Sequence, residues 1–126
     1  MRTHHSLHAW QRANIFVLEV HRNTNLCWKP QVAEVISQLR RSAISMQLNI
    51  AEGYALQTDG YFRKHLTIAY GSGVKSLDAL GLLQKLTTDV SEEIDALLAE
   101  GRRACSLVLA LKHAIDRRTR NEGSFT

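Results

Sequence analysis

The N-terminus carries the one cluster of residues in this sequence that is typical of a metal site. His4, His5 and His8 form an H-H-x-x-H pattern, and His4 and His8 have the four-residue spacing of two zinc ligands on one helix. The zinc protease motif also needs a glutamate directly after its first histidine, and His5 stands there. Because no third ligand is evident, we expect solvated histidines here, without a metal ion or cofactor.

The remaining candidate nucleophiles and motifs do not indicate an enzyme. Cys27 and Cys105 are the only cysteines; such residues usually pack as small apolar groups, and their low number is typical of a reduced, cytoplasmic chain. The sequence has no G-x-x-x-x-G-K-S/T loop and no G-x-G-x-x-G after a strand. Glu52 lacks the positioned partner that a general base needs. We therefore expect no catalytic residues.

A stripe of polar residues interrupts the apolar pattern between positions 30 and 54. Its members are three or four positions apart, so they lie on one side of a helix; they are Gln38, Arg41, Ser45, Asn49 and Glu52. Two interpretations stay open. The stripe is either a solvent-facing strip or a hydrogen-bonded network at a helix or subunit contact, in which Asn49 and Glu52 fix the register of the next helix.

Positive charge is concentrated along the chain. The formal net charge is +4, with +5 on residues 1–75, −4 on residues 76–99 and +3 on residues 100–126. Such a surface favours a polyanion or an acidic protein as partner, although paired cations are also common on plain solvated surfaces. The candidate nucleic-acid-binding residues are Arg40, Arg41, Arg63, Lys64, Arg102, Arg103, Arg117 and Arg118. The pairs at 40–41 and 63–64 can lie on one side of the fold and bind phosphates by charge.

Four amphipathic helices must position these residues. Apolar residues recur at three- and four-residue steps over about 6–23, 30–54, 60–87 and 91–118, and a basic tail over 119–126 is expected to fray. Four such helices with short links in 126 residues predict an all-α single domain, an up-down antiparallel four-helix bundle. No segment has the length and apolarity of a membrane span.

Two further features predict close contacts. A glycine inside a helix costs about 1 kcal/mol relative to alanine, so Gly71 and Gly73 are expected to permit the close approach of a neighbouring helix. Ile44 and Leu48 form a second apolar line on the helix over 30–54, and we expect this line to be a surface between subunits.

Three segments together resemble a known family: AWQRA at 9–13, the stretch at 39–54 that contains NIAEG, and the stretch at 62–72 that contains AYGS. Over residues 7–86 the chain resembles the bacterial four-helix bundle protein family. That family includes proteins encoded by intervening sequences within large-subunit ribosomal RNA genes, and it is related to the accessory variability determinant (Avd) of diversity-generating retroelements. Where the family commonly carries glutamates after G-S, this chain has Lys75 and Leu77, which favours a variant subunit contact.

The resemblance implies a bundle that assembles into a ring-like homopentamer with a basic surface. For the Avd relatives it implies contact with a reverse transcriptase and its structured RNA. We therefore expect a non-enzymatic scaffold that binds RNA or DNA as an accessory partner of a reverse transcriptase. The alternative is a protein-interaction module of the ribosomal RNA intervening-sequence type without a nucleic-acid role.

Overall fold

Residues 3–123 are described by a computed structural model, and the regular elements within them are all helices. In chain order they are η1 (His4–Ser6), α1 (His8–Cys27), η2 (Pro30–Val32), α2 (Ala33–Ala55), α3 (Asp59–Leu86) and α4 (Ser91–Gly123). Both η elements are single turns of 3-10 helix. None of the helices described is long and apolar enough to cross a membrane.

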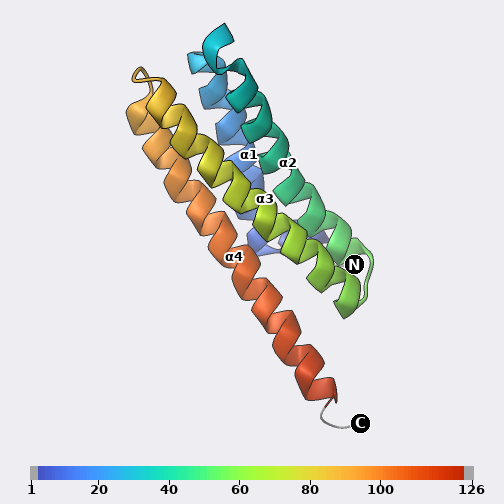
Figure 1. Ribbon diagram of the computed structural model, residues 1–126. Helices are drawn as coiled ribbons and strands as arrows, with labels where there is room; N and C mark the ends of the chain where they lie inside the picture. The colour runs from blue at the N-terminus through green and yellow to red at the C-terminus, as the bar shows by residue number, and fades with distance from the viewer. Residues whose placement is uncertain (1–2, 124–126) are drawn as a thin grey trace.

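The four α-helices lie side by side and alternate in direction (Figure 1). Between α2 and α3, Ser42 is hydrogen-bonded to Ser76 and Ser45 to Ser72. Residue numbers therefore increase along α2 in the direction in which they decrease along α3, which makes the two helices antiparallel. α1 and α3 each pack against both α2 and α4. The arrangement is an up-down antiparallel bundle, the all-helical architecture that the apolar spacing predicts.

Apolar side chains from all four helices meet along the axis of the bundle. Phe16 of α1, Met46 of α2, Leu66 of α3 and Val108 of α4 are each completely buried. Full burial of a side chain of this kind stabilises the fold by about 1.5–3 kcal/mol. The three- and four-residue spacing therefore builds one continuous core and leaves the outward-facing residues to carry polar groups.

The first helix extends beyond the sequence-based boundary at residue 23 and ends at Cys27. Asn23 and Thr24 do not stop it, because their side chains bond to the helix itself: Asn23 Nδ2 donates to the Glu19 carbonyl and Thr24 Oγ1 donates to the Val20 carbonyl at 2.6 Å. Thr24 Oγ1 also accepts from Nε of Arg40. A tertiary contact thus overrides the local preference of these residues for turns.

The last helix is also longer than expected. α4 continues to Gly123, five residues beyond the predicted boundary at 118, and residues 119–123 of the expected frayed tail are helical; residues 124–126 lie outside the described residues. Nε and Nη2 of the Arg118 guanidinium group donate to Oδ2 and Oδ1, respectively, of Asp59 at the start of α3. This bidentate pair holds α4 against the bundle close to where its last turns begin, and those turns project past the other helices (Figure 1).

Gly73 and Gly71 differ sharply although they are two positions apart. A Cβ added at Gly73 would overlap Sγ of Cys105 and lie 3.0 Å from Sδ of Met46, so α3 approaches α4 and α2 closely at this point. Gly71 is exposed, with nothing within 4 Å of an added Cβ. The expectation that Gly71 permits close packing is therefore wrong within the chain: two residues correspond to about 200° around a helix, which turns Gly71 away from its neighbours.

Two other glycines mark close approaches that the sequence did not single out. A Cβ at Gly53, near the end of α2, would lie 2.7 Å from the Cβ of His65 on α3. A Cβ at Gly101 on α4 would lie 2.8 Å from Cδ2 of Leu77 and 3.0 Å from Phe16. Together with Gly73 they let α2, α3 and α4 pack more closely than larger residues would allow.

Alanine substitutions at Gly71 and Gly73 should therefore change stability in opposite directions. Gly71→Ala should raise the free energy of unfolding by about 0.5–1 kcal/mol, because alanine has the higher helix propensity and meets open space. Gly73→Ala should lower it by about 1–3 kcal/mol through overpacking. Urea denaturation followed by circular dichroism measures both, and an equal effect at the two positions would contradict the close approach at Gly73.

Candidate functional site

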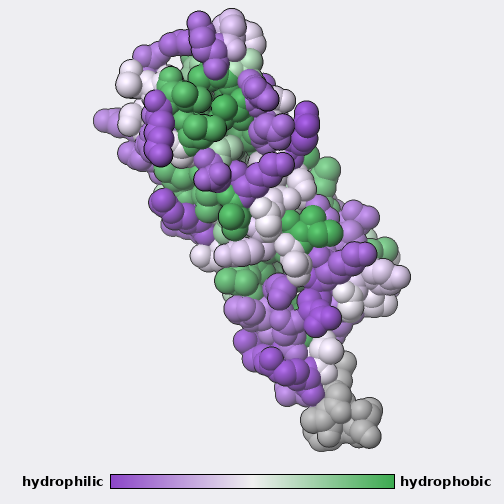
Figure 2. Space-filling view, in the orientation of Figure 1, coloured by the Kyte–Doolittle hydropathy of each residue, from purple (hydrophilic) through white to green (hydrophobic). Residues whose placement is uncertain are grey.

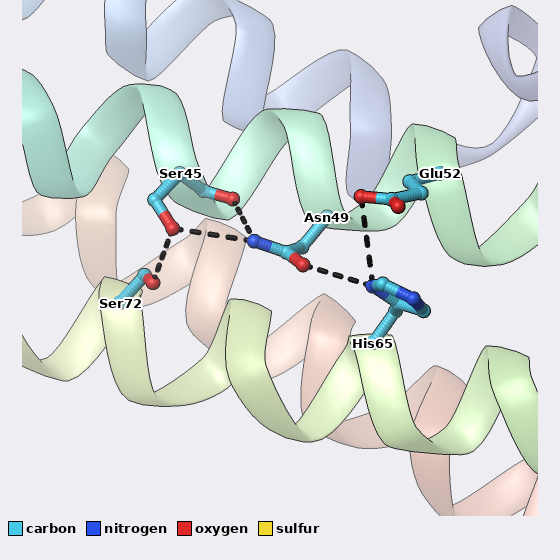
Figure 3. Close-up of polar contacts among 5 residues, drawn as sticks. All are labelled: Ser45, Asn49, Glu52, His65 and Ser72. Carbon is cyan, nitrogen blue, oxygen red and sulfur yellow. Dashed lines mark hydrogen bonds and ion pairs between the residues drawn. The ribbon is translucent and has the colours of Figure 1, made fainter.

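A row of polar side chains joins α2 to α3, and we call it the polar seam (Figure 3). It consists of Ser42, Ser45, Asn49 and Glu52 from α2 and His65, Ser72 and Ser76 from α3. The α2 members step by three, four and three positions, so they face one neighbouring helix. The seam runs beside the buried core and places polar groups where two helices touch.

Asn49 is the centre of the seam. Its Nδ2 donates to the Ser45 carbonyl at 2.9 Å and to Ser45 Oγ at 3.2 Å, which leaves Oδ1 as the acceptor that faces His65. Nδ1 of His65 lies 2.9 Å from that oxygen and therefore carries the proton in this bond. One amide thus links a turn of its own helix to the imidazole of the next.

Paired serine hydroxyls continue the seam toward the other end of α2. Ser45 Oγ and Ser72 Oγ are 2.8 Å apart, and the buried Oγ atoms of Ser42 and Ser76 are 2.7 Å apart. Ser76 Oγ also bonds to the Ser72 carbonyl. Buried polar groups that are bonded in this way fix one relative position of two helices, because a shift along the axis would leave them unpaired.

Glu52 makes only a long contact within the seam, and the other two residues of the predicted stripe, Gln38 and Arg41, are not part of the seam. The side chain of Glu52 is 63% exposed, and its carboxylate lies 3.9 Å from Nδ1 of His65. Arg41 is exposed and Gln38 is half-buried. Asn49, which one interpretation of the stripe places at the contact with the next helix, bonds there to His65. Sequence reasoning missed the three α3 residues His65, Ser72 and Ser76, which are the partners of Asn49, Ser45 and Ser42 respectively. The spacing of those three on α3, seven and four positions, is the signal that could have found them.

The N-terminal histidines pack as rings. His4 and His5 contact the indole of Trp10, with ring centroids 5.1 and 4.7 Å from it. Within residues 3–123, no group of three or more histidine, cysteine or acidic side chains is arranged to hold a metal ion. His8 lies apart from these rings, in a hollow between α1 and α4.

A hollow of about 700 Å³ lies at the end of the bundle where the chain passes from α2 to α3. Leu7, Tyr54, Phe62 and Ile115 contribute apolar surface to it. The charged groups at its edge, Asp59 and Arg118, are bonded to each other.

Both cysteines are buried and free. Burial raises the pKa of the Cys105 thiol above its usual value, and it also raises the pKa of Cys27. A higher pKa keeps both thiols protonated at neutral pH, where only a thiolate would be an effective nucleophile.

Three of the predicted phosphate-binding cations are bonded within the protein. Arg40 donates to Thr24 Oγ1 and Asn25 Oδ1 of α1. Arg63 lies 3.6 Å from Asp116 of α4, and Arg118 pairs with Asp59. The expectation that the pairs at 40–41 and 63–64 share one side is wrong for Arg40 and Arg63, since one turns toward α1 and the other toward α4.

The other predicted cations are exposed and form no ion pair within the described part of the chain. Arg41 and Lys64 lie on α2 and α3, whereas Arg102, Arg103 and Arg117 all lie on α4. Arg120 is exposed on the same helix. The structure therefore concentrates the available guanidinium groups on one helix rather than on a face shared by α2 and α3.

We call Arg102, Arg103, Arg117 and Arg120 the α4 ridge. At about 100° per residue the four lie within roughly 100° of one another around the helix, on its solvent side, and at about 1.5 Å per residue they span roughly 27 Å. Mostly hydrophilic side chains cover the part of the molecule where the C-terminal half of α4 lies (Figure 2). A ridge of this length and charge can bind a polyanion.

Charge is separated along α4. Its first turns carry Glu92, Glu93 and Asp95, and the basic residues follow from Arg102 onward. Carboxylates at a helix N-terminus and cations toward its C-terminus both interact favourably with the helix dipole. The same ordering that stabilises the helix therefore makes one end of it anionic and the other cationic.

Apolar residues are exposed on the outer side of α2 and α3. Ile44 is 36% and Leu48 59% exposed on α2, and Ile68, Leu82 and Leu86 are exposed on α3. Green hydrophobic atoms reach the surface near the end where α3 turns into α4 (Figure 2). The apolar line expected to lie between subunits is thus open to solvent in one chain.

Comparison with known proteins places the chain in a family. A family model described as 23S rRNA-intervening sequence protein matches residues 5–109, a stretch that runs from η1 into α4 and includes the polar seam. The chain belongs to this family. The match includes Arg102 and Arg103 and ends before Arg117. A search of curated proteins found no match.

Replacing Asn49 should destabilise the fold through the polar seam. Asn49→Ala removes the bonds to Ser45 and leaves the imidazole Nδ1–H of half-buried His65 without its acceptor, so the free energy of unfolding should fall by about 1–2 kcal/mol. Urea denaturation monitored by circular dichroism measures the change.

The matched control is Glu52→Ala on the same helix. Because this carboxylate is mostly exposed, the change should stay within about 0.5 kcal/mol. Equal losses in the two variants would contradict a register-setting role for Asn49.

Proposed function

We propose that this member of the 23S rRNA-intervening sequence protein family is a non-enzymatic helical scaffold that self-associates and binds structured RNA through the α4 ridge. The observation that carries the proposal is the set of exposed arginines on α4 that form no ion pair within residues 3–123. Since these guanidinium groups are not neutralised by the protein, they are available to phosphates.

The geometry of the ridge suits a nucleic-acid backbone better than a single small anion. Its arginines are spread over roughly 27 Å of helix at about 1.5 Å per residue, so they can meet phosphates several nucleotides apart. Arginine forms bidentate bonds with phosphate oxygens. Phosphate contacts give affinity without sequence readout. Structured RNA is favoured over DNA because the family's name links it to sequences that intervene in 23S ribosomal RNA.

Self-association would use the exposed apolar line on α2. Ile44 and Leu48 are neighbours one turn apart, and apolar side chains at such spacing are typical of helix contacts between subunits. A ring of five subunits is the number that the resemblance to the Avd relatives implies, and a reverse transcriptase is the protein partner that it implies. Assembly would multiply the ridge, and several copies of a weak phosphate-binding surface bind far more tightly than one.

The non-enzymatic part of the proposal is supported by the state of the candidate catalytic groups. The Ser45 and Ser72 hydroxyls bond to each other, and Nδ1 of His65 is bonded to an amide. The thiols are buried with raised pKa values. A nucleophile needs an adjacent base and access to substrate, and these groups are instead bonded or buried in helix contacts.

Removing charge from the ridge should weaken RNA binding and its dependence on salt. In the variant Arg102→Gln/Arg117→Gln/Arg120→Gln, the slope of log K against log salt for an RNA stem-loop should fall by about 2–3, because each lost phosphate contact lowers it by about 0.7–0.9. Fluorescence anisotropy at several salt concentrations, from low to moderate, measures the association constant K and therefore the slope. Arg103 is kept in this variant.

The charge-matched control is Arg22→Gln/Lys29→Gln/Lys85→Gln, which removes three cations near the opposite end of the bundle. Its salt slope should stay close to that of the unchanged protein. Equal weakening by the two triple variants would contradict the ridge as the binding surface. A protein that binds no RNA even at low salt would overturn the proposal and favour the protein-interaction alternative.

A further inference from the structure

Two adjoining hollows lie between α1 and α4 on the side of the bundle away from the polar seam, and we call them together the groove. The hollows have volumes of about 520 and 360 Å³ and are lined only by residues of these two helices. Ile15 lines both hollows, so they meet at this residue. The groove is thus a single surface with Ile15 near its middle.

The two halves of the groove have opposite charge. The half toward the start of α1 is lined by His8, Arg12 and Arg103. The other half is lined by Glu19, Glu93 and Glu100. Within the protein, Arg12 lies 3.8 Å from Glu100 across the boundary between the halves, and Glu19 accepts a bond from Arg22.

Arg103 and Glu93 stand out in this groove because both are exposed and form no ion pair or hydrogen bond within residues 3–123. They lie on α4 ten positions apart, which corresponds to about 15 Å along the helix. One unpaired cation and one unpaired anion therefore occupy opposite ends of the same face.

We propose that this face binds a second copy of the chain in antiparallel orientation. A two-fold axis that crosses the groove near Ile15 turns each basic half over the acidic half of the other copy. Arg12 then faces Glu19 of the second copy, and Arg103 comes within reach of Glu93 of the second copy. Each pair forms twice because the contact is isologous. A parallel arrangement would instead bring like charges together, so the charge pattern selects the orientation.

An apolar residue at the centre of the face supports the same contact. Ile15 is 38% exposed and lines both hollows, so a two-fold axis at this point brings it near its counterpart in the other copy. Leu18, which is 54% exposed, follows one turn further along α1. The face is about 30 Å long, from 20 residues of α1, and about 20 Å wide for two helices. Its footprint of roughly 600 Å² approaches the ~800 Å² per partner of a standard interface.

This contact is separate from the apolar line on α2 and does not rest on RNA binding. If the α2 line also assembles the protein, the antiparallel contact joins two such assemblies. Where the two-fold contact acts alone, breaking it should halve the mass of the particle; where the α2 line also assembles the protein, the mass should fall to that of the α2-line assembly. Either readout is independent of the RNA-binding measurements.

The charge pair can be tested by reversal and exchange. Arg103→Glu and Glu93→Arg should each weaken the contact at least about tenfold, because each replaces two attractive pairs by two repulsive ones, and each should lower the mass seen in sedimentation equilibrium in this way. The double variant Arg103→Glu/Glu93→Arg should restore the mass. Lys85→Glu, at an exposed cation on α3 outside the groove, should leave it unchanged, and thermal unfolding checks that all variants fold.

A cysteine placed at the proposed axis tests the orientation independently. Ile15→Cys should form a disulfide between copies under a mild thiol oxidant, whereas Leu26→Cys, which is exposed at the far end of α1, should not. A monomer at all concentrations, a mass that Arg103→Glu leaves unchanged, or failure of the double variant to restore the mass would overturn the proposal. Cross-linking at Leu26 but not at Ile15 would overturn the antiparallel orientation.

Discussion

The close approach of α2 and α3 is the constraint on which the other features of the bundle depend. Glycines at 53 and 73 remove side chains that would hold the two helices apart from their neighbours, and paired hydroxyls occupy the space that remains. At such short range a polar group without a partner would cost about 1–3 kcal/mol. The bonded seam therefore makes one register of the two helices more stable than its neighbours, and α4 and α1 pack against a fixed pair.

The fixed pair determines which charged residues are available to other molecules. Once α2 is set against α1, Arg40 reaches Thr24 and Asn25. Once α3 is set against α4, Arg63 and Arg118 reach carboxylates on the facing helix. These arginines hold helices together. The arginines farther from the contacts, on the outer side of α4, are left without partners among the described residues.

The sequence predicts the helices well and their charged contacts poorly, for a physical reason. Apolar spacing reports on burial, and burial of Phe16 or Leu66 depends only on which face of a helix points inward. Whether Arg40 is bonded or free depends on what a different helix presents beside it. The bond between Asn49 and His65 agrees with one interpretation of the stripe because the periodic spacing on α2 already places Asn49 beside a neighbouring helix. Gly71 was misassigned because two glycines only two positions apart lie on opposite sides of a helix and look alike in sequence.

The separation of charge along α4 links the stability of that helix to both proposed surfaces. Acidic residues at its start and basic residues toward its end complement the dipole, so the ordering is favourable even in an isolated chain. The same charge separation places a cationic ridge on the C-terminal half of α4. Together with α1 it also forms a face whose basic half attracts the acidic half of a second copy in the antiparallel orientation only. Arg103 lies where the two surfaces meet, so phosphates and a second copy would compete for its guanidinium group.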